Sequence, residues 1–109
     1  MSYDIRRISS FSNHLKDFAK KYPSVKQDYE TLLASLKNEP QQGTSIGRSC
    51  CKVRMKISSK NSGKSGGARV ITLVRIKAKR ITLLDVYDKS DKESISDKEL
   101  TLLLKEVED

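Results

Sequence analysis

"CKVRMKIS", residues 51–58, is the stretch that decides the fold. Val53, Met55 and Ile57 alternate in it with basic residues, and a period of two is typical of a β-strand with one buried face. The apolar side chains are therefore expected in a core. The opposite face carries a row of three positive charges, from Lys52, Arg54 and Lys56.

Two further β-rich runs follow this strand. "RVITLVRIK" (69–77) has apolar residues on both of its faces, which indicates a central strand. "RITLLDVY" (80–87) begins after only Ala78 and Lys79, and so short a connection predicts a β-hairpin. The middle of the chain therefore builds a sheet.

The first third of the chain has the period of helices. Apolar residues recur at spacings of four and three from Phe11 to Tyr22, which predicts an amphipathic helix. Pro23 interrupts the pattern, and a second apolar stripe then continues to Leu36. Two helices joined so tightly are expected to form an antiparallel hairpin.

A third helix is predicted near the C-terminus, where Ser96 and Glu99 have the spacing of a capping box. The order helix, helix, strand, strand, strand, helix predicts an α+β fold with helices on one face of an antiparallel sheet. Residues 3–8 are a candidate for a short extra strand, and the polar residues 41–49 are expected to form a loop. The length fits one domain, residues 1–109.

Positive charge is concentrated in the middle of the chain. The net charge is +8, and residues 49–84 contain ten Lys or Arg and no Asp or Glu. Such a field attracts phosphates or an acidic partner. No apolar run approaches the ~20 residues of a membrane helix, and the first residues show no export signal. We therefore expect a cytoplasmic protein without membrane contact.

The stretch "SSKNSGKSGG" (58–67) ends like a nucleotide-binding phosphate loop, with Gly-Lys-Ser at 63–65. Such a loop needs a glycine where this chain has Ser58, and it leads into a helix, whereas a strand is predicted here. We therefore predict no small-molecule nucleotide as partner. The stretch is interpreted as a flexible basic hairpin that brings Lys60 and Lys64 to a polyanion.

Few catalytic chemistries fit the residue types. His14 is interpreted as an ordinary surface or boundary histidine, and one histidine with two cysteines makes no zinc site. Asp85, Asp88 and Asp91 have no calcium-loop pattern, so neither metal nor cofactor is expected. Lys, Arg and Tyr alone can cleave RNA by attack of the 2′-hydroxyl, if a Lys or Tyr of lowered pKa moves the proton. The same cluster is equally compatible with only binding RNA, DNA or an acidic protein segment.

Three stretches together resemble the RelE/ParE superfamily of bacterial toxins, and most strongly its RelE-like and HigB-like members. These stretches are "HLKDFAKKYPSVKQDYETLLASL" (14–36), "CKVRMKISSKNSGKSGGARVITLV" (51–74) and "ITLLDVYDKSDKESISDKEL" (81–100). The resemblance implies two N-terminal helices and a C-terminal helix packed on a small curved antiparallel sheet. It also implies a ribosome-dependent, metal-independent mRNA endoribonuclease that inhibits translation and is neutralised by a cognate antitoxin.

The resemblance further implies site residues. Lys52 and Arg54 correspond to a basic pair on the first core strand, and Arg69 to the arginine that opens the next strand. Tyr87 takes the place of a family tyrosine that has no aligned counterpart here. We expect Lys52 or Tyr87 to move the 2′ proton and both arginines to stabilise the transition state, which leaves a 2′,3′-cyclic phosphate. RNA backbone contacts are expected from four lysines: Lys56, Lys60, Lys64 and Lys89.

Two other functions stay open at this point. ParE-type members inhibit DNA gyrase without catalysis, and a third type of chain would keep the fold and the antitoxin contact but lack catalysis. Lys52, Arg54 and Arg69 favour RNA over gyrase. The expected partners are therefore an antitoxin, the ribosome and mRNA.

Overall fold

The computed structural model describes residues 3–60 and 67–107, and in this part of the chain it has three helices and five strands. The middle of the predicted basic hairpin, with Lys64, lies outside the described residues. None of the helices described is long and apolar enough to cross a membrane. In chain order the elements are β1 (Asp4–Arg7), α1 (Ser9–Lys21), α2 (Val25–Asn38), β2 (Thr44–Gly47), β3 (Cys50–Met55), β4 (Ala68–Arg75), β5 (Arg80–Asp88) and α3 (Asp97–Lys105).

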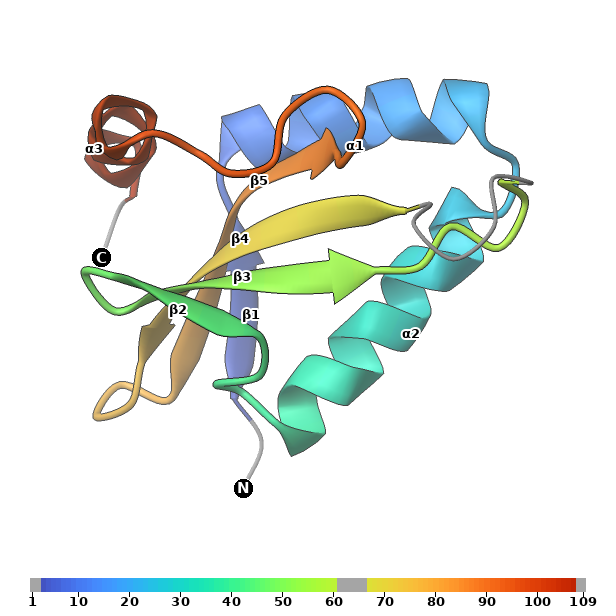
Figure 1. Ribbon diagram of the computed structural model, residues 1–109. Helices are drawn as coiled ribbons and strands as arrows, with labels where there is room; N and C mark the ends of the chain where they lie inside the picture. Colours follow the sequence, from blue (N-terminus) through green and yellow to red (C-terminus); the bar gives the residue numbers. More distant parts are fainter. Residues whose placement is uncertain (1–2, 61–66, 108–109) are drawn as a thin grey trace.

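The strands form one twisted sheet in the order β1-β5-β4-β3-β2 (Figure 1). Strands β2 to β5 pair antiparallel, as predicted for the three strands recognised in the sequence. β1 occupies the place of the candidate N-terminal strand and runs parallel to β5, so the sheet is mixed.

β2 lies where the sequence predicts a loop, and for residues 44–47 that prediction is wrong. The strand has only four residues, and all but Ile46 are exposed. A register shift between Ser45 and Gly47 interrupts its pairing with β3. A short, exposed edge strand of this kind has no buried face, and therefore no alternation that a sequence pattern can reveal.

The predicted helix hairpin is confirmed, and α1 and α2 contribute their apolar stripes to one core with the sheet. Phe11 of α1 and Leu36 of α2 are fully buried in the same cluster as Val53 and Met55 of β3. α1 also packs along β5. This arrangement covers the face of β3 that the alternating apolar residues predicted to be buried.

The predicted capping box at the start of α3 is confirmed. Ser96 Oγ accepts a hydrogen bond from the Glu99 amide at 3.1 Å, and the Glu99 carboxylate accepts one from the Ser96 amide at 3.1 Å. Leu100 and Leu103 bury the apolar side of the helix. Almost every residue of β4 and β5 is buried, so both faces of the central strands are covered. The α+β class is confirmed, but the helices cover two faces of the sheet rather than the one expected.

A buried carboxylate ties the start of α2 to the segment after β3. Asp28 accepts hydrogen bonds from Ser24 Oγ at 2.7 Å, from Ser58 Oγ at 2.6 Å and from the Ser58 amide at 2.9 Å. Burial alone would raise the pKa of Asp28, but these hydrogen bonds hold it below its ordinary value. The carboxylate is therefore part of the framework.

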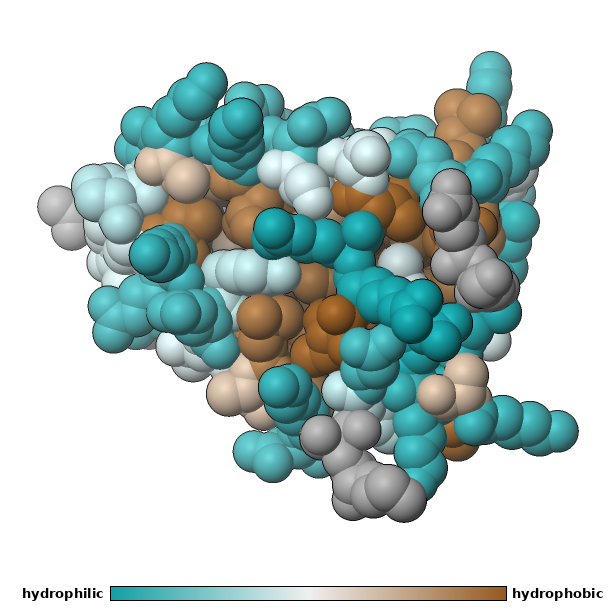
Figure 2. All heavy atoms as spheres, turned by 180° about the vertical axis from the view of Figure 1, so that it is seen from behind, coloured by the Kyte–Doolittle hydropathy of each residue, from teal (hydrophilic) through white to brown (hydrophobic). Residues whose placement is uncertain are grey.

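Apolar side chains gather in the middle of the rear face, where hydrophilic side chains surround them (Figure 2). Partly buried apolar residues of β1, α1 and α2, among them Ile5, Phe18 and Leu33, pack against the core. Only two large apolar side chains of the described residues are classed as exposed, Ile76 at 57% and Leu102 at 56%. Ile76 lies in the turn between β4 and β5, and Leu102 lies on α3.

Candidate nucleic-acid interface

Three predicted site residues form one row across the sheet. Arg54 of β3 is aligned with Arg69 of β4, and Arg69 is aligned with Tyr87 of β5. Residues directly opposite one another in neighbouring strands point to the same face, with Cβ atoms about 5 Å apart. Because Val53 and Met55 point to the core beneath α2, the row lies on the opposite face. We call these three residues the basic row.

Arg69 is a buried cation. The residue is only 8% exposed, and its Nη1 donates a 3.3 Å hydrogen bond to the carbonyl oxygen of Ala68. Among the described residues, neither Arg69 nor Arg54 has a carboxylate within 4.0 Å. Burying a charge without a counter-charge is unfavourable. The arrangement is therefore suited to an anion that comes from outside the chain.

Tyr87 contributes a buried hydroxyl to the same row. The residue is 7% exposed, and its hydroxyl has no hydrogen-bond partner among the described residues. Burial raises the pKa of the Tyr87 phenol above its ordinary value, opposed by the charge of Arg69 and reinforced by Asp85 and Glu99. A buried polar group without a partner is rare in folded proteins. This phenol is a proton-bearing donor that a ligand oxygen can satisfy.

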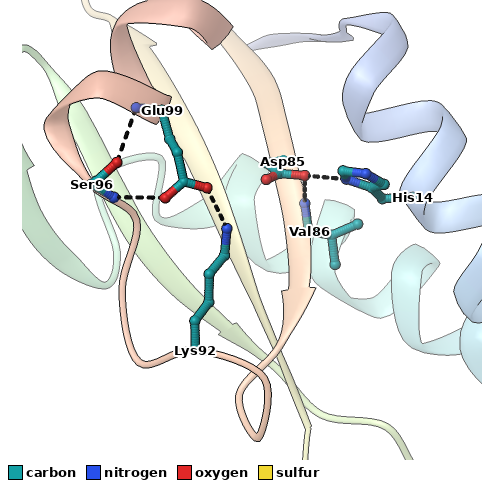
Figure 3. A network of polar contacts seen from close by, with 6 residues as sticks. All are labelled: His14, Asp85, Val86, Lys92, Ser96 and Glu99. Carbon is teal, nitrogen blue, oxygen red and sulfur yellow. Dashed lines mark hydrogen bonds and ion pairs between the residues drawn. The ribbon is translucent and has the colours of Figure 1, made fainter.

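Two lysines border the row, one from the loop before α3 and one from β3. Lys92, from the loop before α3, lies 4.9 Å from the centre of the Tyr87 ring and donates to Glu99 Oε2 at 2.7 Å (Figure 3). Lys52 of β3 donates to the carbonyl oxygen of Glu93 at 3.2 Å. The bond from Lys92, with those of the capping box, lowers the pKa of Glu99 to about 2. Both ammonium groups are therefore held beside the basic row.

The predicted RNA-binding lysines lie elsewhere or at the margin. Lys60 Nζ is 3.0 Å from a carboxylate oxygen of Asp88, on the other face of β5, and 5.7 Å from the centre of the Tyr22 ring. Lys56 is exposed beyond β3, and its charge helps to lower the pKa of Asp28 in α2.

Lys89 follows β5 directly and is half-buried, with its amide donating to the Gly67 carbonyl at 3.3 Å. Lys64 lies outside the described residues. The structure thus brings together the four residues predicted to be catalytic: Lys52, Arg54, Arg69 and Tyr87. It places Lys60 in an internal ion pair. The RNA contacts predicted for Lys56, Lys60, Lys64 and Lys89 stay predictions.

Lys92 and Asp85 were missed as site residues by the sequence reading. The sequence assigns Asp85 no role beyond the absence of a calcium-loop pattern, although it lies inside β5 and is only 6% exposed. A charged residue within the apolar run "LLDVY" was the signal that it has a specific partner. Lys92 gave no comparable signal, because only the folded loop brings it over Tyr87. In the described residues, no group of three His, Cys, Asp or Glu is arranged to hold a metal ion.

The chain is thus a small α+β domain with one face that carries two arginines and a buried phenol in a row. Residues 12–108 match the model of the family described as the RelE toxin of the RelE/RelB toxin–antitoxin system. The chain therefore belongs to the RelE toxin family. Membership implies a protein antitoxin as its partner.

A solved structure supports the same fold. The chain is similar to a free-state structure of the E. coli toxin RelE that carries two arginine-to-alanine mutations, with a TM-score of 0.61. The sequence identity is 14%, and the likeness covers 99% of this chain and 100% of that chain. At this identity the likeness concerns the fold alone. No curated protein matches the chain.

Proposed function

We propose that this chain is the toxin of a type II toxin–antitoxin system and stops translation by cleaving mRNA on the ribosome. The observation that carries the proposal is the basic row, where a buried arginine and a buried phenol lie side by side. Among residues 3–60 and 67–107, the arginine has no carboxylate partner and the phenol hydroxyl has no hydrogen-bond partner. A phosphodiester supplies what both groups lack, because its oxygens are negatively charged acceptors.

The row fits the charge that develops when a 2′-hydroxyl attacks the neighbouring phosphate. The attack adds negative charge to the oxygens of the five-coordinate phosphorus, and guanidinium groups fixed beside it stabilise that charge. Arg54 and Arg69 are assigned this role. The product is a 2′,3′-cyclic phosphate at the end of the upstream fragment, and no metal takes part in the proposed step.

Tyr87 has a different role from the one expected from the sequence. A tyrosine that removes a proton needs a lowered pKa, and burial raises the pKa of Tyr87 instead. We therefore assign Tyr87 as a hydrogen-bond donor to the phosphate. Lys52 and Lys92 are assigned to the RNA backbone on either side, since their ammonium groups border the row.

The test is cleavage of a defined mRNA bound to purified ribosomes by the full chain. We expect cuts in the ribosome-bound message, with upstream fragments that end in a 2′,3′-cyclic phosphate and no cuts in the same RNA without ribosomes. Intact mRNA together with early DNA damage in cells would contradict the proposal and indicate a gyrase inhibitor. Intact mRNA without any toxicity would also contradict it and indicate an inactive, antitoxin-binding chain.

A further inference from the structure

His14 and Asp85 form a polar pair beside the basic row. His14 Nδ1 lies 2.5 Å from Asp85 Oδ1, and the same oxygen accepts the Val86 amide at 2.9 Å (Figure 3). The Asp85 side chain is 8% exposed, whereas that of His14 is 52% exposed. One partner is thus fixed in the sheet and the other is open to solvent.

Asp85 lies on the face of β5 that also carries Tyr87 of the row, and His14 reaches Asp85 from α1. Asp85 precedes Tyr87 by two residues on β5, a separation of about 6.7 Å along a strand. Figure 3 shows His14 on α1 at one side of β5 and Lys92 with Glu99 at the other. Ser10, one turn before His14 on α1, donates a hydrogen bond to Glu106 just past α3 at 2.5 Å. The side of α1 that carries His14 therefore faces α3.

The geometry of the pair is that of an oriented base. A carboxylate only accepts hydrogen bonds, so in the neutral imidazole Nδ1 carries the hydrogen and Nε2 is left as the acceptor. The buried carboxylate fixes the ring and its tautomer, as in catalytic histidine–carboxylate pairs. No hydrogen bond to Nε2 is found among the described residues, and the ring is exposed enough for a substrate to reach it.

The charged and titratable groups around His14 come from several elements. β5 contributes Asp85 and, beyond it, Tyr87, whose pKa is affected by the Asp85 charge. The segment after α3 contributes Glu106, and α1 itself carries Asp17 three residues on. α2 places the Tyr29 ring against Phe11 of α1. Among these groups, Asp85 alone is hydrogen-bonded to the imidazole.

We propose that His14 is the catalytic residue that takes the 2′ proton and that Asp85 is its positioning residue. This inference rests on the proposed function, and it supplies the base that Tyr87 is unsuited to be. In the step, Nε2 accepts the proton of the 2′-hydroxyl as the 2′-oxygen bonds to phosphorus. The bond from phosphorus to the 5′-oxygen breaks, its electron pair leaves with that oxygen, and water protonates it. The imidazolium then returns its proton to solvent.

The test compares single-turnover cleavage of ribosome-bound mRNA by four full-length proteins from about pH 5.5 to about pH 8.5. His14→Gln keeps an amide that can bond to Asp85 but cannot take up a proton. We expect its cleavage rate to be about 100-fold lower at neutral pH. A plot of its rate against pH should also lack the imidazole limb, which is the part of the wild-type profile where the rate changes because an imidazole gains or loses a proton. Asn13→Ala, an exposed neighbour on α1, is the matched control and is expected to match the wild type.

The fourth protein, Asp85→Asn, tests positioning. Without the carboxylate the ring loses the acceptor that orients it, so we expect a reaction that is slower than that of the wild type but faster than that of His14→Gln. If His14→Gln has the rate and the pH profile of the wild type, the inference is overturned. It is also overturned if His14→Gln is slower by the same factor at every pH and keeps the imidazole limb, because that result indicates a structural role for His14. Each of these results leaves the proposed function standing if the wild type cleaves. A wild type that cuts no mRNA removes the proposed function and this inference together.

Discussion

Two charged regions of the molecule differ in how their charges are satisfied. At the corner formed by α2, the segment after β3 and the end of β5, Asp28 accepts three hydrogen bonds and Asp88 is paired with Lys60 at 3.0 Å. In the basic row, Arg69 is equally buried but has no carboxylate partner among the described residues. Among the described residues, the buried charges of the corner have hydrogen-bond or ion-pair partners, whereas Arg69 has no oppositely charged partner.

The pKa directions follow the same division. At the corner, burial alone would raise the pKa of Asp88, but hydrogen bonds from Ser90 and Lys60 hold it below the ordinary value, and Asp28 behaves alike. In the row, burial dominates and raises the pKa of Tyr87. Partnered charges thus stabilise this fold, whereas Arg69 and the Tyr87 hydroxyl lack such partners among the described residues, as the proposed binding of a phosphate requires.

The largest expected effect comes from removing the buried charge of the row. Arg69→Met keeps the aliphatic volume but removes the guanidinium. We expect cleavage on ribosomes to fall by about 10²–10³-fold, as when one group that stabilises a developing anion is lost. We expect no loss of thermal stability, because no carboxylate of the described residues lies within 4.0 Å of Arg69. Unfolding of the variant together with the loss of activity would place Arg69 in the framework and abolish the contrast.

Asp28→Ala is expected to give the opposite result. The variant removes the acceptor of three hydrogen bonds and leaves the Ser58 amide without one, so the free energy of unfolding should fall by about 2–3 kcal/mol in denaturant titrations. Cleavage per folded molecule should not change. Asp17→Ala, an exposed carboxylate on α1, is the matched control and should unfold like the wild type.

Acid should weaken the corner in the wild type. Because the folded-state pKa values of Asp28 and Asp88 are lowered, both contribute stability above the unfolded-state value of about 3.9, and this is lost as the pH falls through their folded-state values. Asp28→Ala should therefore show a shallower loss of stability in acid. An identical pH dependence in both proteins would argue against the role of this carboxylate.

The smallest single-site effect is expected for Lys60→Met. It breaks the ion pair with Asp88, which keeps its bonds from Ser90, so we expect a loss of about 1 kcal/mol in stability and an unchanged affinity for RNA. Weakened RNA binding with unchanged stability would instead support the role predicted for Lys60 from its sequence position. RNA binding and thermal unfolding measured on one preparation decide between the two.

The fold could be predicted where a pattern has a physical cause. The alternation of residues 51–58, the helical stripes of α1 and α2 and the Ser96–Glu99 capping box each record one buried face or one helix end, and the structure confirms them. β2 could not be predicted, because it buries no face. The position of α3 could not be predicted either, because its apolar stripe does not say which face of the sheet it covers.

The site could be predicted only in part for a related reason. Lys52, Arg54 and Arg69 stand out as charges on or next to apolar strands, and strand pairing brings them together. Lys92 comes to Tyr87 from a loop and His14 comes to Asp85 from α1, so their roles depend on tertiary packing that no local pattern records. Lys60 is the opposite case, because its place in a basic loop predicts a contact with RNA, whereas in the fold it forms an ion pair with the carboxylate of Asp88.

The salt dependence of RNA binding tests most directly whether the basic row binds phosphate. Each phosphate contact to single-stranded RNA contributes about 0.7 to the slope of the logarithm of the association constant against the logarithm of salt concentration. For Arg69→Gln we predict a slope that is smaller by about 0.7 than that of the wild type. Lys37 is an exposed cation at the end of α2, and the control variant Lys37→Gln should leave the slope unchanged. A slope for Arg69→Gln equal to that of the wild type would contradict the account.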